Sequence, residues 1–150
     1  MSNNLLKGKR GIIFGALNDM SIAWKVAERA QEEGATFTLT NAPIAMRMGA
    51  INDLAEKTNS KVIPADATSV EDLKHLFEKS QEILGGKVDF VLHSIGMSPN
   101  VRKKKPYTGL NYEWYKQTLD VSAMSLHKTL QVAYDMDALN NWGSVLALTY

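Results

Sequence analysis

Short apolar runs alternate with longer amphipathic stretches along the chain. Apolar or β-branched runs at 12–14, 36–40, 61–65 and 88–93 predict four strands, and residues 144–150, which read SVLALTY, predict a fifth, buried strand. Between these runs, apolar side chains recur at helical spacing. Alternating strands and helices are typical of a parallel sheet covered on both faces. We therefore expect an α/β, doubly wound, Rossmann-like fold.

Four helices are expected between the strands. The first starts at Ser21, a suitable N-cap residue, and the second covers 46–57. The third starts at Ser69, which has the spacing of a capping box with Asp72, and the last covers 112–137. The residues expected to face the core are Ile22, Ala23, Val26, Ala27 and Ala30 in the first helix, Met48, Ile51, Leu54 and Ala55 in the second, and Val70, Leu73, Leu76, Phe77, Ile83 and Leu84 in the third.

Composition limits the possible classes of protein. The 150 residues are 45% hydrophobic and 22% charged, which are ordinary values for one globular domain over residues 1–150. A net charge of +1 gives no support for nucleic acid or an anionic membrane as partner. The absence of cysteine excludes disulfides and fits a cytoplasmic protein. Because the fifth run stops with nothing to cover its faces, we expect a domain truncated after strand five.

The stretch over residues 10–23 is the most informative part of the chain. A strand, a turn at Gly15 and a helix beginning at Ser21 form the arrangement that binds a dinucleotide pyrophosphate, because free amides and the positive end of the helix dipole face the anion. Only the first glycine of the G-x-G-x-x-G pattern is present. An ordinary strand–turn–helix therefore remains the alternative at this point.

Further candidate residues follow the other strands. In a doubly wound sheet, ligands lie outside the carboxyl ends of the strands. Asp66 follows the third strand and could accept a hydrogen bond from an adenine amino group, or could serve as a turn residue. Gly96 follows the fourth strand, two residues after Ser94, and would let the backbone pass beside a nicotinamide ribose, or could be an ordinary loop glycine. Because Gly15, Asp66 and Gly96 all follow strands, they are expected at the same edge of the sheet, and this common location favours a dinucleotide site.

A resemblance to a known family rests on four groups of residues. They are Gly15 with Ser21-Ile22-Ala23, Asp66, His93-Ser94-Ile95-Gly96 and Leu148-Thr149-Tyr150, and together they resemble the bacterial enoyl-[acyl-carrier-protein] reductases, a divergent branch of the short-chain dehydrogenase/reductases. The resemblance covers the whole chain in order. It implies that a hydride passes from NADH, or from NADPH, to the β-carbon of a trans-2-enoyl thioester in type II fatty-acid synthesis. It also implies acyl carrier protein as partner and a cytoplasmic homotetramer.

The resemblance also implies roles for individual residues. Gly15, Ser21 and Ile22 match the pyrophosphate-binding turn, Asp66 and Ala67 the adenine position, and Ser94, Ile95 and Gly96 the nicotinamide-side loop. Met97 and Ser98 lie where the family lines its substrate pocket, and Tyr150 matches the first of two active-site tyrosines, a catalytic position. The second tyrosine and its lysine are expected after position 150. This chain alone is therefore not expected to catalyse the reaction normally.

Several alternatives remain open. Asn41-Ala42-Pro43 follows the second strand, where NAD enzymes normally carry an acid and NADP enzymes a cation, so NADH is favoured and NADPH is not excluded. Another short-chain enzyme acting on a carbonyl, or a non-catalytic nucleotide-binding fragment, would share much of this pattern. The basic run at 102–105 could meet an acidic carrier protein or could simply be solvated. The three histidines share no metal-ligand spacing, so no metal site is expected.

Overall fold

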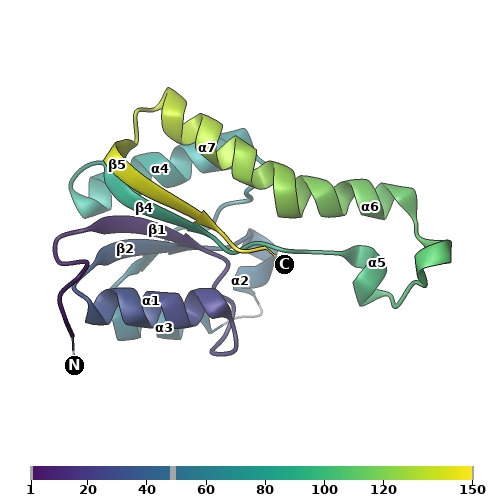
Figure 1. Cartoon of the computed structure of the whole chain (residues 1–150), viewed down its shortest axis with the longest axis horizontal. Helices are drawn as coiled ribbons and strands as arrows, with labels where there is room; N and C mark the ends of the chain where they lie inside the picture. The colour runs from purple at the N-terminus through teal and green to yellow at the C-terminus, as the bar shows by residue number, and fades with distance from the viewer. Residues whose placement is uncertain (1, 48–49, 150) are drawn as a thin grey trace.

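A five-stranded sheet forms the centre of the protein (Figure 1). The structure is a computed structural model and describes residues 2–47 and 50–149. The strands pair in the order β3-β2-β1-β4-β5, and each pair is parallel. This order confirms the predicted Rossmann-like sheet, because the chain runs outward from β1 to one edge and then crosses back to the other. The strands are β1 (Arg10–Phe14), β2 (Thr36–Thr40), β3 (Lys61–Val62), β4 (Val88–His93) and β5 (Leu139–Ala147).

Helices cover both faces of the sheet (Figure 1). On one face lie α1 (Ile22–Glu32) and α3 (Ile51–Thr58), and on the other lie α4 (Val70–Leu84) and α7 (Ser125–Asp135). The helix α6 (Tyr112–Leu119) continues through a π-helical turn, η2 (Asp120–Met124), directly into α7. Short helical segments complete the chain: α2 (Pro43–Met46), α5 (Pro99–Arg102) and η1 (Tyr107–Gly109). The α5–α6 region projects beyond the sheet at the carboxyl ends of the strands (Figure 1).

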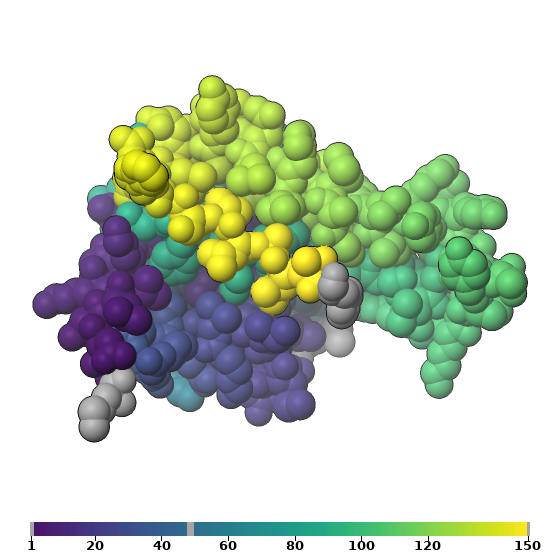
Figure 2. All heavy atoms as spheres, viewed as in Figure 1, coloured from purple at the N-terminus to yellow at the C-terminus, as the bar shows by residue number. Residues whose placement is uncertain are grey.

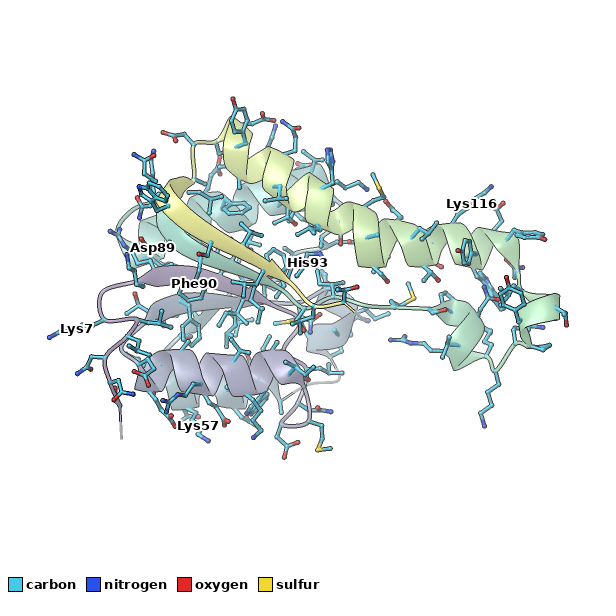
Figure 3. The ribbon with its side chains drawn as sticks, viewed as in Figure 1. Lys7, Lys57, Asp89, Phe90, His93 and Lys116 are labelled. Atoms are coloured by element: carbon cyan, nitrogen blue, oxygen red, sulfur yellow. The ribbon has the colours of Figure 1, made fainter. Side chains whose placement is uncertain are left out.

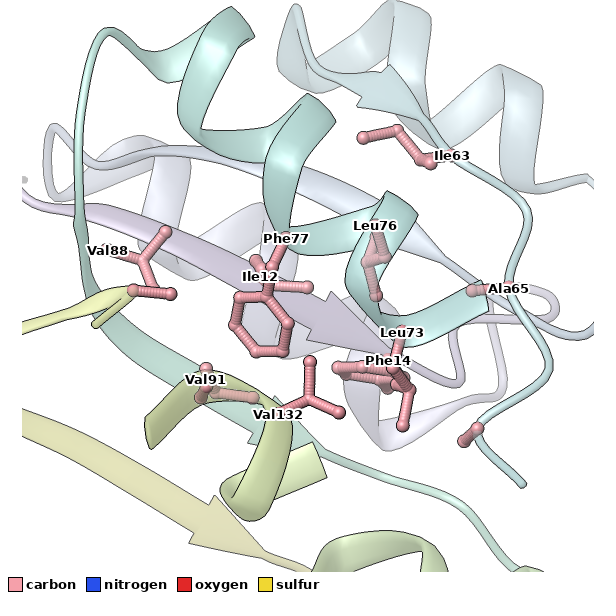
Figure 4. Packing of buried hydrophobic residues seen from close by; sticks show 13 residues of the cluster. Ile12, Phe14, Ile63, Ala65, Leu73, Leu76, Phe77, Val88, Val91 and Val132 are labelled. Atoms are coloured by element: carbon pink, nitrogen blue, oxygen red, sulfur yellow. The ribbon is translucent and has the colours of Figure 1, made fainter. Parts of the chain in front are cut away.

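Alternate residues of β1 supply the two hydrophobic cores. Ile12 and Phe14 face α4 and α7, whereas Ile13 faces α1 and α3. Phe77 of α4 packs over Ile12 beside Val132 of α7 (Figure 4). Because successive side chains of a strand point to opposite faces, a central strand that is apolar throughout is buried on both sides. For this reason the apolar run at 12–14 could be recognised from the sequence as a strand buried on both faces.

The predicted helix over 46–57 is wrong in its first part. The chain instead forms α2, which begins at Pro43, and then α3, which begins at Ile51. Proline is favoured in the first turn of a helix because its missing N–H has no partner there. Ile51, Leu54 and Ala55 are buried as predicted, and Met48 lies outside the described residues.

Two strand predictions also need correction. β3 ends at Val62, three residues earlier than expected, although the amides of Ile63 and Ala65 still donate to β2 and the residue after it. Pro64 has no N–H to continue the ladder. The fifth strand was expected to be buried, but it lies at the sheet edge, and Leu146 is 53% exposed. Figure 2 shows this C-terminal segment running across the molecular surface.

Three expected core residues on the helices are exposed. Ile22, Val70 and Ile83 keep 64%, 46% and 46% of their surface accessible, while Trp24 is buried in place of Ile22. Val70 and Ile22 are the first residues of their helices. A side chain in the first turn can project past the end of the sheet, where no strand covers it. For Ile22 this places the side chain at the candidate site.

Candidate cofactor site

The carboxyl ends of β1 and β4 bring Gly15 against Ser94. Gly15 has a φ of +88°, and a β-carbon at this position would lie 1.8 Å from the carbonyl oxygen of Ser94. The amide of Gly15 donates to the carbonyl of Thr40, the last residue of β2 (3.0 Å). Glycine is therefore required here by the contact between the two loops, before any ligand is considered.

Ser21 shapes the turn between β1 and α1 rather than capping the helix with its side chain. Its hydroxyl oxygen accepts hydrogen bonds from the amides of Leu17 and Asn18, both at 3.1 Å, and makes no cap bond. Within the described residues, the amides of Ile22 and Ala23 have no hydrogen-bond partner. Two free donors at the positive end of an eleven-residue helix are suited to an anionic phosphate.

Asp66 serves as a turn residue and keeps one oxygen available. Its Oδ1 accepts from both the amide and the hydroxyl of Thr68, at 2.8 and 2.7 Å. Its Oδ2 receives no hydrogen bond from the part of the chain that the structure describes. The turn role and the adenine role are therefore compatible, because each uses a different oxygen. The hydroxyl of Ser69 caps α4 by accepting from the amide of Asp72, as predicted, but the Asp72 carboxylate accepts from the amide of Asp66 (2.9 Å) and not from that of Ser69, so the capping box is incomplete.

A large hollow lies beside the loop that follows β4. Its volume is about 370 Å³, and a side chain on Gly96 would point into open space because no atom lies within 4 Å of its β-carbon position. The structure thus brings together residues from β1–α1, β4 and β5 at one place. The residues lining this hollow are Ile22, Ser94, Ile95, Gly96, Leu148 and Thr149.

A second, smaller hollow of about 50 Å³ lies on the Asp66 side. Ala67, which was predicted to border the adenine, also lines it, and Ile95 lines both hollows. Ile95 therefore lies between the two hollows, with Gly15 on the smaller one and Ile22 on the larger one. An elongated ligand could occupy both hollows while passing the free amides of α1.

Met97 and Ser98 line neither hollow. The amide of Met97 donates to the hydroxyl of Ser122 (3.0 Å), and the hydroxyl of Ser98 accepts from the amide of Val101 (3.4 Å) at the start of α5. Their predicted place along the substrate pocket stays a prediction. Tyr150, the predicted catalytic residue, lies outside the described residues.

His93 ends β4 behind the site and is 1% exposed. Its Nε2 lies 2.8 Å from the hydroxyl of Ser125, which donates to the carbonyl of Val121 at 2.6 Å. Since that hydroxyl has one proton, Nε2–H must be the donor to Ser125. Burial lowers the pKa of His93 below its ordinary value. The His93 ring labelled in Figure 3 lies under the continuous helix formed by α6, η2 and α7, called the long helix below. This position fits a neutral structural residue.

Asn41, already noted after the second strand, borders the site together with residues that were missed from sequence. Asn41 donates from its side-chain amide to the carbonyl of Ala16 (3.2 Å) and accepts from the amide of Ala42 (2.9 Å). The residues after β2 thus brace the Gly15 turn and bring no acid to it. Thr68 and Val121 line the smaller hollow, and Ser122 holds Met97. A hydroxyl or an aliphatic side chain within a helical pattern carries no sequence signature, so these residues could not be singled out.

Over residues 2–47 and 50–149 there is no group of three or more His, Cys, Asp or Glu side chains arranged to hold a metal ion. In the same ranges, no helix combines the length and apolar character needed to cross a bilayer.

The chain is similar to known proteins in both sequence and structure. The family model described as enoyl-(acyl carrier protein) reductase matches residues 15–150. One relative is the enoyl-[acyl-carrier-protein] reductase [NADH] FabI of Rickettsia conorii. It is 31% identical to this chain over 154 residues, which cover all of this chain and 56% of that protein. The chain thus spans about half the length of the curated relatives it matches.

Solved structures agree with this relationship. The crystal structure of a FabI–NADH complex from Alistipes finegoldii matches with a TM-score of 0.96 and 63% identity, over 98% of this chain and 52% of that one. An enoyl-(acyl-carrier-protein) reductase from Anaplasma phagocytophilum, solved with NAD, matches with a TM-score of 0.84 and 27% identity, over 97% of this chain and 55% of that one. This chain belongs to the enoyl-(acyl carrier protein) reductase family.

Proposed function

We propose that residues 1–150 form one dinucleotide-binding domain, the cofactor-binding part of an NADH-dependent enoyl-[acyl-carrier-protein] reductase. The observation that carries the proposal is the pair of hollows on either side of Ile95, of which the larger is lined by Ile22 at the start of α1, where two amides are free. Family membership gives the reaction class, and the hollows give a place for a dinucleotide. NADH as the cofactor is supported by relatives whose names specify NADH and by a related protein solved in complex with NADH.

The residues present fit a dinucleotide. Asp66 would accept from the adenine amino group through Oδ2, with Ala67 beside the ring. The amides of Ile22 and Ala23 would donate to the pyrophosphate, next to the close-packed Gly15 turn. Residues 94–96 would border the nicotinamide and its ribose, where the open position at Gly96 leaves room.

The chemistry is hydride transfer. When bound, NADH supplies a hydride to the β-carbon of a trans-2-enoyl thioester. The contribution of these residues is to bind the cofactor, to orient it and to shield one of its sides. Met97 and Ser98 would border the substrate, and Tyr150 would help to place it. Catalysis also requires the family's second tyrosine and its lysine, which we place outside these 150 residues.

The absence of a charged group after β2 favours NADH. Asn41 uses its side chain to brace the turn, and neither Ala42 nor Pro43 could neutralise a 2′-phosphate. Arg47 is exposed beyond α2. A 2′-phosphate would therefore gain no cation from the residues that immediately follow β2.

Acyl carrier protein and further copies of the chain are the proposed partners, in the cytoplasm. The basic side chains at 102–105 are exposed on the projecting α5 region, where they could attract an acidic carrier protein. The outer side of α6 exposes Tyr112, Tyr115 and Leu119, which would suit packing between subunits of a tetramer. Neither nucleic acid nor a membrane is proposed as a partner.

Substrate comparison tests the reaction. In the protein translated from the whole reading frame, crotonyl thioesters should be reduced with NADH and ketoacyl thioesters should not. The reverse preference would identify a carbonyl-reducing short-chain enzyme instead. Cofactor binding without either reduction would favour a non-catalytic nucleotide-binding protein. Parallel assays with NADPH decide the cofactor preference.

A further inference from the structure

The hydroxyl of Ser122 holds the loop that follows β4. It accepts a hydrogen bond from the amide of Met97 at 3.0 Å and donates to the carbonyl of the same residue at 3.3 Å. Ser122 lies in η2, so one side chain of the long helix uses both its donor and its acceptor on one residue of the loop. Met97 directly follows Gly96, which borders the larger hollow.

The loop on the adenine side is attached to the same helix. The ammonium group of Lys128 donates to the carbonyl of Thr68 at 3.1 Å and to the carboxylate of Asp120 at 2.8 Å. Thr68 in turn is bound to Asp66 through its amide and hydroxyl. Asp120 is the first residue of η2, so η2 and the turn after it reach both loops of the candidate site.

The π-helical geometry allows this double attachment. A π turn contains an extra residue relative to an α-helix, and it shifts the direction of the side chains that follow; such turns are frequent at functional sites. Here the carbonyl of Val121 accepts from Ser125, whose hydroxyl also meets His93 at the end of β4. The helix is thus fixed to β4 at the same level as the loop that it holds.

We propose that η2 and the first turn of α7 are the positioning element of the cofactor site, with Ser122 fixing the nicotinamide-side loop through Met97 and Lys128 fixing the adenine-side loop through Thr68. The inference rests on the proposed function and extends it to residues that do not line the large hollow. Ordering the two loops before binding reduces the conformational entropy that is lost when the cofactor binds. Removal of one attachment should therefore weaken the contact with one part of the cofactor.

Two variants separate the attachments. In Ser122→Ala, NADH affinity should fall roughly three- to tenfold, the equivalent of one hydrogen bond, while ADP affinity stays unchanged because ADP lacks the nicotinamide half. In Lys128→Met, NADH and ADP should weaken by the same factor. Ser122→Thr keeps a hydroxyl and should restore NADH affinity.

Matched controls lie on the same long helix. Thr118→Val removes a hydroxyl that donates to the carbonyl of Trp114 and touches neither loop. Lys116→Met removes an exposed charge that pairs with Glu113 (Figure 3). Both controls should bind NADH and ADP as the parent chain does. Affinities would be measured by titration calorimetry on the 150-residue chain.

Hydrogen exchange at the amide of Met97 supplies a readout that needs no cofactor. Ser122→Ala should speed this exchange at least several-fold relative to the parent chain and to Thr118→Val. Unchanged exchange in Ser122→Ala, or an equal loss of NADH and ADP affinity in that variant, would overturn the inference. Failure of the parent chain to bind NADH and ADP would contradict the proposed function, while the exchange measurement would still decide whether Ser122 holds the loop.

Discussion

The carbonyl oxygen of Ser94 occupies the space where a side chain on Gly15 would begin, 1.8 Å from the β-carbon position. The two residues end neighbouring strands, β1 and β4, and each starts a loop of the candidate site. Their contact fixes the Gly15 turn relative to the loop that follows β4. From the sequence, Gly15 was assigned only to a turn that binds a pyrophosphate, whereas the contact with Ser94 already requires glycine. A substitution there would disturb the protein itself, so it cannot test ligand binding cleanly.

Gly15→Ala should lower the free energy of unfolding by about 3 kcal/mol or more, because backbone strain at positive φ adds to a clash with a main-chain oxygen. Gly85→Ala is the matched control, since Gly85 has a φ of +77° and no atom within 4 Å of its β-carbon position. It should cost only about 1 kcal/mol. Urea denaturation measures both values. Equal costs for the two variants would contradict the proposed contact between the loops.

Ser21→Ala should weaken NADH and ADP binding by roughly fivefold each, because the amides of Leu17 and Asn18 lose their shared acceptor and the turn loosens. Ser60→Ala, which removes a hydroxyl near the end of α3, should leave both affinities unchanged. Calorimetric titration provides the comparison. Unaltered ADP affinity in Ser21→Ala would show that this turn does not support the pyrophosphate.

His93 should make stability depend on pH in the mildly acidic range. Its folded-state pKa lies below the ordinary value of 6.5, so between the two values the unfolded chain binds more protons. Its contribution is present in full above about pH 6.5 and is lost as the pH falls below it, at no more than about 1.4 kcal/mol per pH unit. Urea denaturation at several pH values measures this slope.

His93→Gln should remove the part of that slope that appears as the pH falls below 6.5. NMR titration of the parent imidazole gives an independent check, since the midpoint of its titration should lie below that of free histidine. Protonation of His93 with an ordinary midpoint would contradict the burial argument.

Glu28 should contribute to stability against acid. Lys57 of α3 donates to its carboxylate at 2.7 Å, and this hydrogen bond is the main reason that the pKa of Glu28 falls from 4.5 to about 2. Burial opposes the shift, and Trp24 and Lys25 add smaller lowering contributions. Because the folded pKa is the lower one, the contribution is present above about pH 4.5 and disappears as the pH falls toward 2.

Lys57→Met should raise the pKa of Glu28 and reduce the loss of stability on acidification. Lys61→Met is the matched control, because it also removes one exposed lysine charge, from β3. NMR titration of the Glu28 carboxyl group distinguishes the variants. If the pKa of Glu28 is the same in Lys57→Met as in the parent chain, the contact between α1 and α3 is disproved.

The central sheet could be predicted because its signals are local. β2 and β4 have the expected bounds, since a β-branched run and an apolar run are each bounded by polar or small residues. The fifth strand carries an apolar pattern like that of a buried strand, yet Leu146 is exposed because its neighbours in space do not cover it. Burial at an edge depends on tertiary contacts that a local pattern does not contain.

The candidate site was predictable only in part. Gly15, Asp66 and Gly96 could be found because each follows a strand at one edge of the sheet. Ser122 could not, because its contact with Met97 joins residues 25 positions apart and depends on a π turn inside a long helix. Ile22 was expected in the core and instead borders the larger hollow, because its place in the first helical turn carries it past the sheet.

NADH binding to the 150-residue chain and to Gly96→Val tests the central claim most directly. Gly96 has room for a side chain and no positive φ, so valine should leave the melting temperature nearly unchanged while filling part of the larger hollow. The account predicts saturable NADH binding by the parent chain, loss of at least about tenfold in NADH affinity in Gly96→Val, and equal ADP affinity in both. A folded parent chain that binds neither nucleotide, or a Gly96→Val variant that binds NADH as tightly as the parent, would contradict it.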